Sequence, residues 1–196
     1  PVGRFLNLFR NQLVIADNLN TVNYSDIDSP EYFPPGDNGF DVYTNRGDTI
    51  TGLGSLPNLL LIFKGKSIHA ASGDFSEDSF RVDQVNKGEI GCIAHHTIQE
   101  VNGSLYFLSE KGLFSISDSA ELKELSYNID PEFTKPNLPY NLKKAVAINW
   151  LFQDLYIVIL PTETSTAGDY YLDTVNTKVF AYDYTRSSWF QWDNIN

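Results

Sequence analysis

The chain has 196 residues, of which 42% are hydrophobic and 20% are charged, so it is long enough to bury a sizeable core. Its 14 basic and 25 acidic residues give a net charge of −11, which argues against a protein that binds duplex DNA through the phosphates. The chain begins at Pro1 and contains no methionine, so we expect a fragment of a longer product. Because no apolar run approaches roughly 20 residues and no basic-then-apolar leader is visible, we expect neither a membrane span nor a secretory signal.

Short apolar runs and turn signals alternate along the chain in four successive groups, and each group supplies four predicted strands. The groups occupy residues 4–44, 50–85, 97–125 and 144–192. The predicted strands are 4–9, 13–16, 21–25 and 40–44; 50–56, 59–63, 67–71 and 80–85; 97–101, 105–108, 113–116 and 121–125; and 144–149, 155–160, 178–182 and 189–192.

The second strand of each group defines the repeat. Aligned on Leu13, Leu60, Leu105 and Leu155, the groups recur after 47, 45 and 50 residues, a period typical of propeller blades. The dipeptide Asn102-Gly103 predicts a tight two-residue hairpin within the third group. Sixteen strands in fours predict an all-β fold over residues 1–196, namely a β-propeller of four blades with four antiparallel strands each, or an arc of a larger propeller.

Burial is expected to differ with the position of a strand in its blade. The second strands are continuously apolar, as in sheets that are covered on both sides. The fourth strands are polar or mixed, which suits exposed sheet edges. The third strand of the third group, 113–116, contains Ser115 and is predicted to be half-buried.

The loop after residue 25 gathers the carboxylates Asp26, Asp28 and Glu31, and it is the only candidate metal site in the sequence. Carboxylate oxygens bind calcium, but these residues lack the spacing of the twelve-residue calcium loop. Carboxylates in loops more often cap turns or stay solvated, so this role is expected for all three and no bound metal is expected.

The sequence offers no clear catalytic motif. His95 and His96 are adjacent, and neighbours on a strand point to opposite faces, so they are not expected to share a metal ion. Cys92 has apolar neighbours and is expected to be a buried structural thiol. No nucleophile elbow, phosphate-binding loop or zinc-protease motif is present, so no enzyme activity and no cofactor are expected. The tripeptide Arg46-Gly47-Asp48 spells an integrin-binding motif, but it falls where a turn between strands is due.

Aromatic residues supply the candidates for contacts with a partner, namely Tyr32, Phe33, Trp189 and Trp192. The spacing of the two tryptophans places them on opposite sides of one strand. Exposed aromatics bind carbohydrate in some propellers, whereas packing between blades is the alternative use of such side chains.

Five segments together resemble propeller regions of tailed-phage virion proteins. They are YSDIDSPEYF (24–33), GDTITGL (47–53), LLIFKGKSI (60–68), GEIGCIA (88–94) and LYFLSEKGL (105–113). In this order they are similar to tail hub or nozzle proteins of short-tailed phages, such as tail tubular protein B and packaged-DNA stabilisation protein, over most of residues 10–192. The resemblance implies a ring of copies, commonly six, below the portal, which extends the channel for DNA exit and carries no catalytic residues.

We therefore expect a structural virion component that contacts other tail and portal proteins and meets DNA only as passing cargo. An acidic wall that does not bind DNA agrees with such a conduit. A propeller that binds glycans or a cell surface is the first alternative, and it should expose tryptophans or tyrosines on one open face. A propeller hydrolase is the second, and it should bring two carboxylates to about 5–10 Å apart at the channel mouth.

Overall fold

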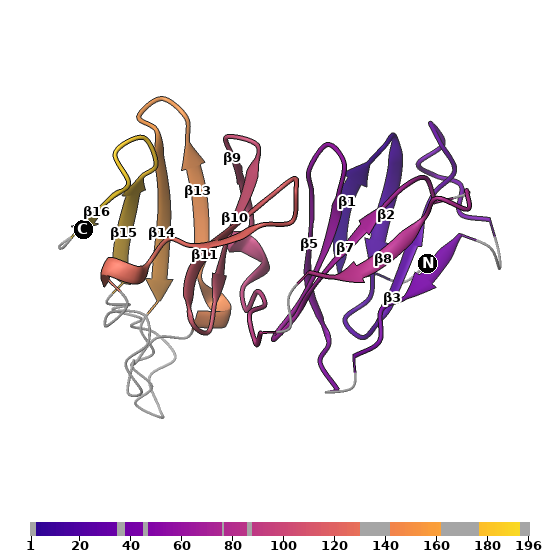
Figure 1. Ribbon diagram of the computed structural model, residues 1–196, viewed down its shortest axis with the longest axis horizontal. Helices are drawn as coiled ribbons and strands as arrows, with labels where there is room; N and C mark the ends of the chain where they lie inside the picture. Colours follow the sequence, from indigo (N-terminus) through magenta and orange to yellow (C-terminus); the bar gives the residue numbers. More distant parts are fainter. Residues whose placement is uncertain are drawn as a thin grey trace, which may run out of the picture.

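The computed structural model describes residues 3–34, 38–44, 47–75, 77–85, 88–129, 142–161 and 177–192. Within these residues sixteen strands form four antiparallel sheets of four strands, and each sheet follows the order of the chain. Figure 1 shows the sheets side by side along the long axis of the molecule. The predicted fold class is confirmed: the chain is an all-β protein that forms four blades of a β-propeller.

Each blade is a simple meander from its inner strand to its outer edge. Blade 1 contains β1 (Phe5–Phe9), β2 (Gln12–Ala16), β3 (Thr21–Tyr24) and β4 (Gly39–Asp41). Blade 2 contains β5 (Ile50–Ser55), β6 (Leu60–Lys64), β7 (Ile68–Ser72) and β8 (Arg81–Gln84). Blade 3 contains β9 (Gln99–Val101), β10 (Ser104–Ser109), β11 (Gly112–Ser117) and β12 (Leu122–Glu124). Blade 4 contains β13 (Val146–Trp150), β14 (Leu155–Pro161), β15 (Thr177–Asp183) and β16 (Ser188–Trp192).

Three short 3-10 helices accompany the strands: η1 (His95–Thr97), η2 (Tyr127–Ile129) and η3 (Leu142–Lys144). The predicted strand start at Thr97 is therefore wrong, because η1 occupies residues 95–97 and β9 begins only at Gln99. In the sequence, an aspartate cap at Asp130 followed by Pro131 predicts a short helical turn, and these two residues lie outside the described part of the chain.

The predicted hairpin turn at Asn102-Gly103 is present. Asn102 has φ 49° and Gly103 has φ 72°, the two left-handed conformations that a tight hairpin between right-twisted strands requires. The β1–β2 hairpin uses the same geometry at Arg10 and Asn11, with φ values of 49° and 60°. Asparagine tolerates this region well, whereas arginine is strained there.

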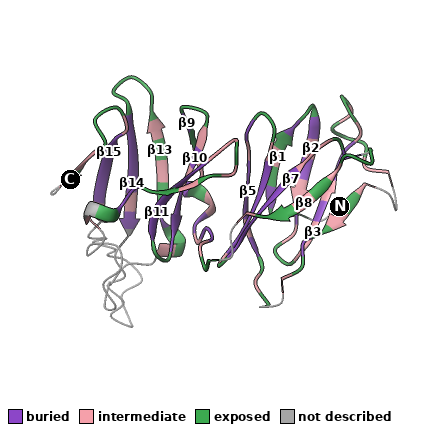
Figure 2. Ribbon diagram, viewed as in Figure 1, coloured by how far each residue is buried: buried purple, intermediate pink, exposed green. Residues whose placement is uncertain are grey.

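Burial follows the position of each strand in its blade, as Figure 2 shows. Every residue of β6 is buried, while the outer strands β8 and β12 contain no buried residue. The prediction that residues 113–116 are half-buried is wrong, because all four are buried. Phe114 and Ile116 contact blade 2 whereas Leu113 contacts blade 4, so neighbouring blades cover both faces of β11.

Three apolar clusters join the blades in sequence. The first joins blades 1 and 2 and includes Phe5, Phe9, Val14, Val22, Leu53, Leu60, Ile62 and Phe75. The second joins blades 2 and 3 and includes Leu61, Phe63, Ile68, Leu105, Phe107 and Phe114. The third joins blades 3 and 4 and includes Leu108, Leu113, Tyr156, Val158, Phe180 and Tyr182. The molecule therefore has a core at every internal blade junction.

Two glycines bring blades 2 and 3 together at their inner strands. A Cβ on Gly54 would lie 2.5 Å from Cδ1 of Leu105, and a Cβ on Gly52 would lie 2.6 Å from Cδ1 of Ile98. Both distances are far below van der Waals contact, so any larger residue at these positions would displace the Leu105 and Ile98 side chains, and glycine allows the close approach of β5 to blade 3.

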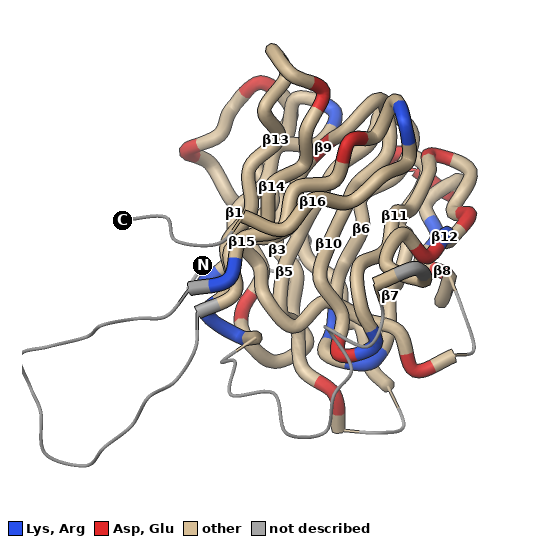
Figure 3. Tube along the Cα trace, turned by 90° about the vertical axis from the view of Figure 1, so that its left-hand side faces the viewer, with Lys and Arg blue, Asp and Glu red and all other residues tan. Residues whose placement is uncertain are grey.

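The charged residues lie mainly at the ends of the blades, as Figure 3 shows, and most of the strand surface carries neither sign. Among the described residues, no helix has the length and apolar character needed to span a bilayer.

Candidate protein-interaction surface

The acidic loop after β3 is held by hydrogen bonds within the chain. The Asp26 carboxylate accepts a hydrogen bond from Asn38 Nδ2 at 3.1 Å, and the Asp26 amide bonds to the Tyr32 carbonyl at 3.0 Å. Asp28 adopts φ 55°, the left-handed conformation of a turn residue, while the Glu31 side chain is exposed. No cluster of three or more His, Cys, Asp or Glu residues suited to a metal ion is found in the described ranges. The loop geometry is that of a turn.

The histidine pair lies in η1 rather than on a strand, so the prediction that the two side chains point to opposite faces of a strand is wrong. The His95 ring packs edge-on against Phe5 at a centroid distance of 5.1 Å, and it lies 5.5 Å from the His96 ring. Burial, followed by the nearby His96, lowers the pKa of His95. His95 is thus held as a neutral ring between blades 1 and 3, and its buried Nδ1 has no hydrogen-bond partner.

Cys92 is fully buried, in agreement with the predicted structural thiol. Its Sγ donates to the Ala94 carbonyl at 3.2 Å. Burial raises the pKa of the thiol to about 12, which keeps it protonated and unreactive at neutral pH.

A buried lysine and an aspartate form a network that sequence reasoning missed. Lys64 is fully buried at the end of β6, and its Nζ donates to Asn20 Oδ1 at 2.7 Å and to the Asp48 carbonyl at 2.9 Å. Desolvation lowers the pKa of Lys64, and the charges of Asp48 and Asp17 partly oppose this shift. The only sequence signal was a lysine that continues the apolar run of residues 59–63.

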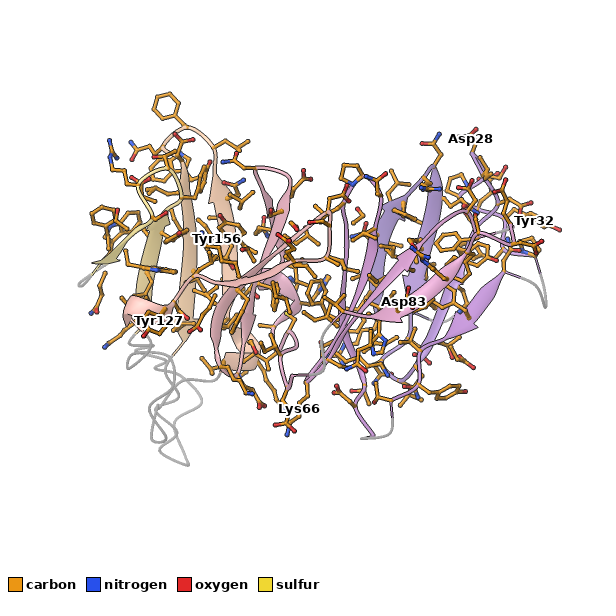
Figure 4. All side chains as sticks on the ribbon, in the orientation of Figure 1. Asp28, Tyr32, Lys66, Asp83, Tyr127 and Tyr156 are labelled. Atoms are coloured by element: carbon orange, nitrogen blue, oxygen red, sulfur yellow. The ribbon has the colours of Figure 1, made fainter. Side chains whose placement is uncertain are left out.

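The carboxylate of Asp48 is engaged in the β6–β7 turn, which Figure 4 locates by the label on Lys66. It accepts hydrogen bonds from the amides of Gly65 and Lys66 at 2.9 Å each, and from Ser67 Oγ at 3.1 Å. The aspartate of the Arg-Gly-Asp tripeptide therefore holds a turn of its own chain, whereas Arg46 lies outside the described residues.

The inner strands of all four blades surround one hollow of about 560 Å³. Its lining mixes apolar and polar side chains, among them Leu6, Leu53, His95, His96, Glu100 and Val146. A second hollow of about 930 Å³ shares the two histidines with the first. It is lined by charges of both signs, from Arg4, Asp48, Lys66, Glu89, Glu110, Lys143 and Lys144.

The two tryptophans lie on opposite faces of β16, as predicted. Trp189 pairs with Tyr182, and its ring packs 4.8 Å from the tyrosine ring. Its Nε1 donates to the Leu125 carbonyl at 2.9 Å, so Trp189 belongs to the junction of blades 3 and 4. Trp192 pairs with Val179 on the face that points away from blade 3.

The aromatic candidates do not gather on one open face. Tyr32 is exposed and Phe33 is half-buried in the loop of blade 1. Figure 4 places Tyr32 and the exposed Tyr127 at opposite ends of the molecule. Trp189 is half-buried in the junction of blades 3 and 4.

An apolar surface lies on the face of blade 4 that points away from blade 3, here called the blade 4 outer face. Strand register places ten apolar residues on it, because cross-strand partners share a face. They are Val146, Ile148, Trp150, Leu155, Ile157, Ile159, Val179, Ala181, Phe190 and Trp192. The central members are buried, but Ile148 is 60% exposed, and Val146, Trp150 and Phe190 are exposed as well.

Blade 1 has a smaller apolar surface at the other end of the molecule, here called the blade 1 outer face, and its β3 and β4 part is polar, with Thr21, Asn23 and Asp41. Leu6 pairs with Ile15 and Leu8 pairs with Leu13 on the side opposite to the junction with blade 2. Leu6 and Leu8 are 58% and 61% exposed. Sequence reasoning missed both outer faces, although the alternation of apolar residues with Ala147 and Asn149 in β13 was a visible signal of a strand with one apolar face.

Comparisons with known proteins agree with this architecture. A chain of the Nup159 N-terminal domain structure is similar over 98% of this chain and 47% of its own, with a TM-score of 0.57 and 11% identity. A chain in the structure of an S. cerevisiae Dbp5 variant bound to Nup159, a Gle1 variant, IP6 and ADP is similar over 97% of this chain and 46% of its own, with a TM-score of 0.55 and 12% identity. At this identity the similarity shows the fold alone, and the chain spans about half the length of both structures. No family model matches the chain, and no curated protein matches it either.

Proposed function

We propose that this chain is a non-catalytic propeller segment that works by contacts with other protein chains. The observation that carries the proposal is the pair of apolar outer faces on blades 1 and 4. Contiguous exposed apolar residues on a folded domain mark surfaces that bind protein. The polar groups around the inner strands are less suggestive of a site, because the Asp48 carboxylate and the Lys64 ammonium are engaged in bonds within the chain.

The specific setting that we propose is the tail hub or nozzle of a phage virion. The resemblance of residues 24–33, 47–53, 60–68, 88–94 and 105–113 to tail hub and nozzle proteins supports this setting. There the segment would belong to a ring of copies, commonly six in the proteins that it resembles, and contact other tail and portal proteins. The net charge of −11 suits a wall past which DNA moves without binding.

The full-length parent protein provides the test. Mass measurement and electron microscopy are expected to show a ring with an open central channel. A monomer at all concentrations would contradict the ring, and specific binding on a glycan array would then favour a cell-surface propeller. Hydrolysis of a polysaccharide, abolished by replacing a single carboxylate that lines the inner hollow, such as Glu100→Gln, would overturn the non-catalytic proposal.

A further inference from the structure

The short helix η1 lies where all four blades come together. It packs against β5 of blade 2, β10 of blade 3 and β13 of blade 4. Its first residue adds blade 1, because the His95 ring packs edge-on against Phe5 at a centroid distance of 5.1 Å. A Cβ on Gly52 would lie 2.9 Å from His95 Nδ1, so the backbone of β5 runs close to this nitrogen. The charge of His95 is therefore felt at the inner strands of every blade.

The Nδ1 atom of His95 is buried and has no hydrogen-bond partner within the described residues. A neutral imidazole fits such a place, since Nε2 can carry its one proton while Nδ1 stays bare. A protonated imidazole carries N–H groups on both nitrogens. Protonation would bury an N–H donor without an acceptor, together with a positive charge, and both cost free energy. The packing therefore favours the neutral ring.

The charged groups around His95 give a protonated ring little compensation. Strands β1, β5 and β13 contain no titratable side chain, and β10 contains only Tyr106, whose pKa burial raises to about 12. The His96 ring lies 5.5 Å from the His95 ring, and a charge on it would repel a charge on His95. Burial, followed by His96, lowers the pKa of His95. The described charges that share the two hollows with His95 are of both signs, with Arg4, Lys66, Lys143 and Lys144 against Asp48, Glu89, Glu100 and Glu110.

We propose that His95 is an acid-sensitive joint between the blades, in which protonation of the ring loosens η1 and the inner strands that pack on it. The sign follows from proton linkage. The fold lowers the pKa of His95 from its ordinary value of 6.5, so the loosened chain binds the proton more readily than the packed chain. The joint is tight above pH 6.5 and loosens as the pH falls from 6.5 toward the lowered pKa of the packed state. This device involves no partner chain, so it stands apart from the proposed function.

The chain contains one cysteine, and it reports on the state of η1. Cys92 is fully buried, and its Sγ donates to the Ala94 carbonyl at 3.2 Å, just before η1. The same sulfur lies 4.0 Å from Oγ1 of Thr97, the last residue of η1. Loosening of η1 is therefore expected to uncover the thiol. A dipyridyl disulfide, a reagent that still reacts with thiols in acid, serves as the probe.

The experiment measures the rate at which the probe labels Cys92 in the 196-residue chain, from about pH 7.5 down to about pH 5.5, across the ordinary range of histidine titration. Each rate is divided by that of a small free thiol at the same pH, which removes the effect of pH on the reagent. The normalised rate of the parent chain is expected to rise as the pH falls, by about threefold to about tenfold per pH unit. Tenfold is the limit for one proton.

Two variants separate the charge of His95 from its packing. His95→Gln removes the titrating ring, so the rise in labelling with acid is expected to disappear. Ile98→Val is the matched control, because Ile98 Cδ1 packs at the same glycine, 2.6 Å from a Cβ on Gly52, and carries no charge. This control is expected to raise the labelling rate by the same factor at every pH and to keep the dependence on pH of the parent chain.

A second buried histidine requires a background variant. His69 lies in β7 with its Nε2 3.4 Å from Ser67 Oγ, and burial, followed by the charge of Lys64, lowers its pKa as well. Acid therefore weakens blade 2 through His69 with the same sign. In a His69→Gln background the rise in Cys92 labelling is expected to persist, because His69 lies outside η1. Loss of the rise in this background would assign the acid response to His69 and overturn the inference.

Two further results would overturn the inference. A parent chain whose normalised labelling rate does not change with pH would show that η1 stays closed in acid. A rise that His95→Gln leaves intact would assign the response to another group. If His95→Gln loses its β-sheet circular dichroism, the test moves to a chain that carries His69→Gln and His96→Gln, in which His95 is the only histidine. Its ring signal in NMR is expected to titrate below pH 6.5, and a midpoint at or above 6.5 would overturn the proposal.

Discussion

The junction of blades 2 and 3 and the blade 4 outer face are built from the same materials and differ in their surroundings. Each is an apolar face of a four-stranded sheet that is rich in aliphatic and aromatic residues. At the junction Phe107 is 0% exposed, whereas Ile148 on the outer face is 60% exposed. Central residues such as Ile157 are buried on the blade 4 outer face as well, so the neighbouring blade decides the burial of the inner strand, where Ile148 stays exposed.

The largest expected effect comes from emptying the internal junction. Phe107→Ala removes a fully buried ring that packs 4.9 Å from Phe63 across the junction. The loss of transfer free energy and the cavity left behind are expected to cost about 3–5 kcal/mol in the free energy of unfolding. Urea denaturation measures this cost, and Ile148→Ala is the matched control, expected to cost less than about 1 kcal/mol because the Ile148 side chain is largely exposed. Equal unfolding costs for Phe107→Ala and Ile148→Ala would contradict the difference in burial between the junction and the outer face.

Filling the space at the inner strands is expected to cost somewhat less. Gly54→Ala places a methyl group 2.5 Å from Leu105 Cδ1 and 3.1 Å from Ile98 Cγ2, so the Leu105 side chain must move. Overpacking of this kind costs about 1–3 kcal/mol. If the clash with Leu105 is the cause, the penalty shrinks in a Leu105→Ala background, and a double-mutant cycle by urea denaturation measures the difference. An unchanged penalty would assign the cost to the backbone of β5 instead.

A hydrogen bond between blades 3 and 4 provides a third test, of intermediate size. The buried Tyr156 hydroxyl donates to the Thr97 carbonyl at 2.7 Å, and burial drives the pKa of the phenol well above its usual value. Tyr156→Phe leaves that carbonyl without its donor and is expected to cost about 1–2 kcal/mol, measured by thermal and urea unfolding. Tyr184→Phe is the matched control, because its hydroxyl bonds to Asp154 at an exposed site, and we expect it to change stability by less than about 0.5 kcal/mol.

The smallest effect concerns the response to acid at the turn between β15 and β16. A hydrogen bond from the Thr185 hydroxyl, followed by the Arg186 amide, lowers the pKa of Asp183 from 3.8 to about 2. A lowered pKa means that the unfolded chain binds the proton more readily, so this group stabilises the fold above about pH 4 and the contribution is lost as pH falls toward 2. Asp183→Asn is expected to lower the melting temperature at pH 6. The difference in melting temperature between this variant and the parent chain is expected to be smaller at pH 2. A constant difference across this range would contradict the assignment.

The sequence predicted the fold well because the signals for blades are local. Alternating apolar residues and turn residues such as Asn102-Gly103 act within a few positions, and their recurrence every 45–50 residues specified four similar units. The opposite orientation of Trp189 and Trp192 followed from the two-residue period of a strand. The burial of Cys92 followed from its apolar neighbours.

The errors arose where distant segments decide the outcome. Residues 113–116 contain Ser115 and were predicted to be half-buried, yet blades 2 and 4 cover both faces of that strand. His95 lies in a turn beside Phe5, a residue 90 positions away in the sequence. The candidate partner residues were chosen for their aromatic character, whereas most apolar residues of the two outer faces are aliphatic, and of the candidates only Trp192 lies on one of these faces.

By itself the sequence determined the strands, the turns and the four-blade repeat of this protein, since hydrogen bonding along a strand and φ preferences in a turn depend on neighbouring residues. Only the tertiary structure decided which apolar faces are covered and which distant polar groups meet, as the buried Lys64 ammonium meets the Asn20 side chain. The reason is physical: solvent exposure depends on what packs against a face, and in a propeller that neighbour is a whole blade away along the chain.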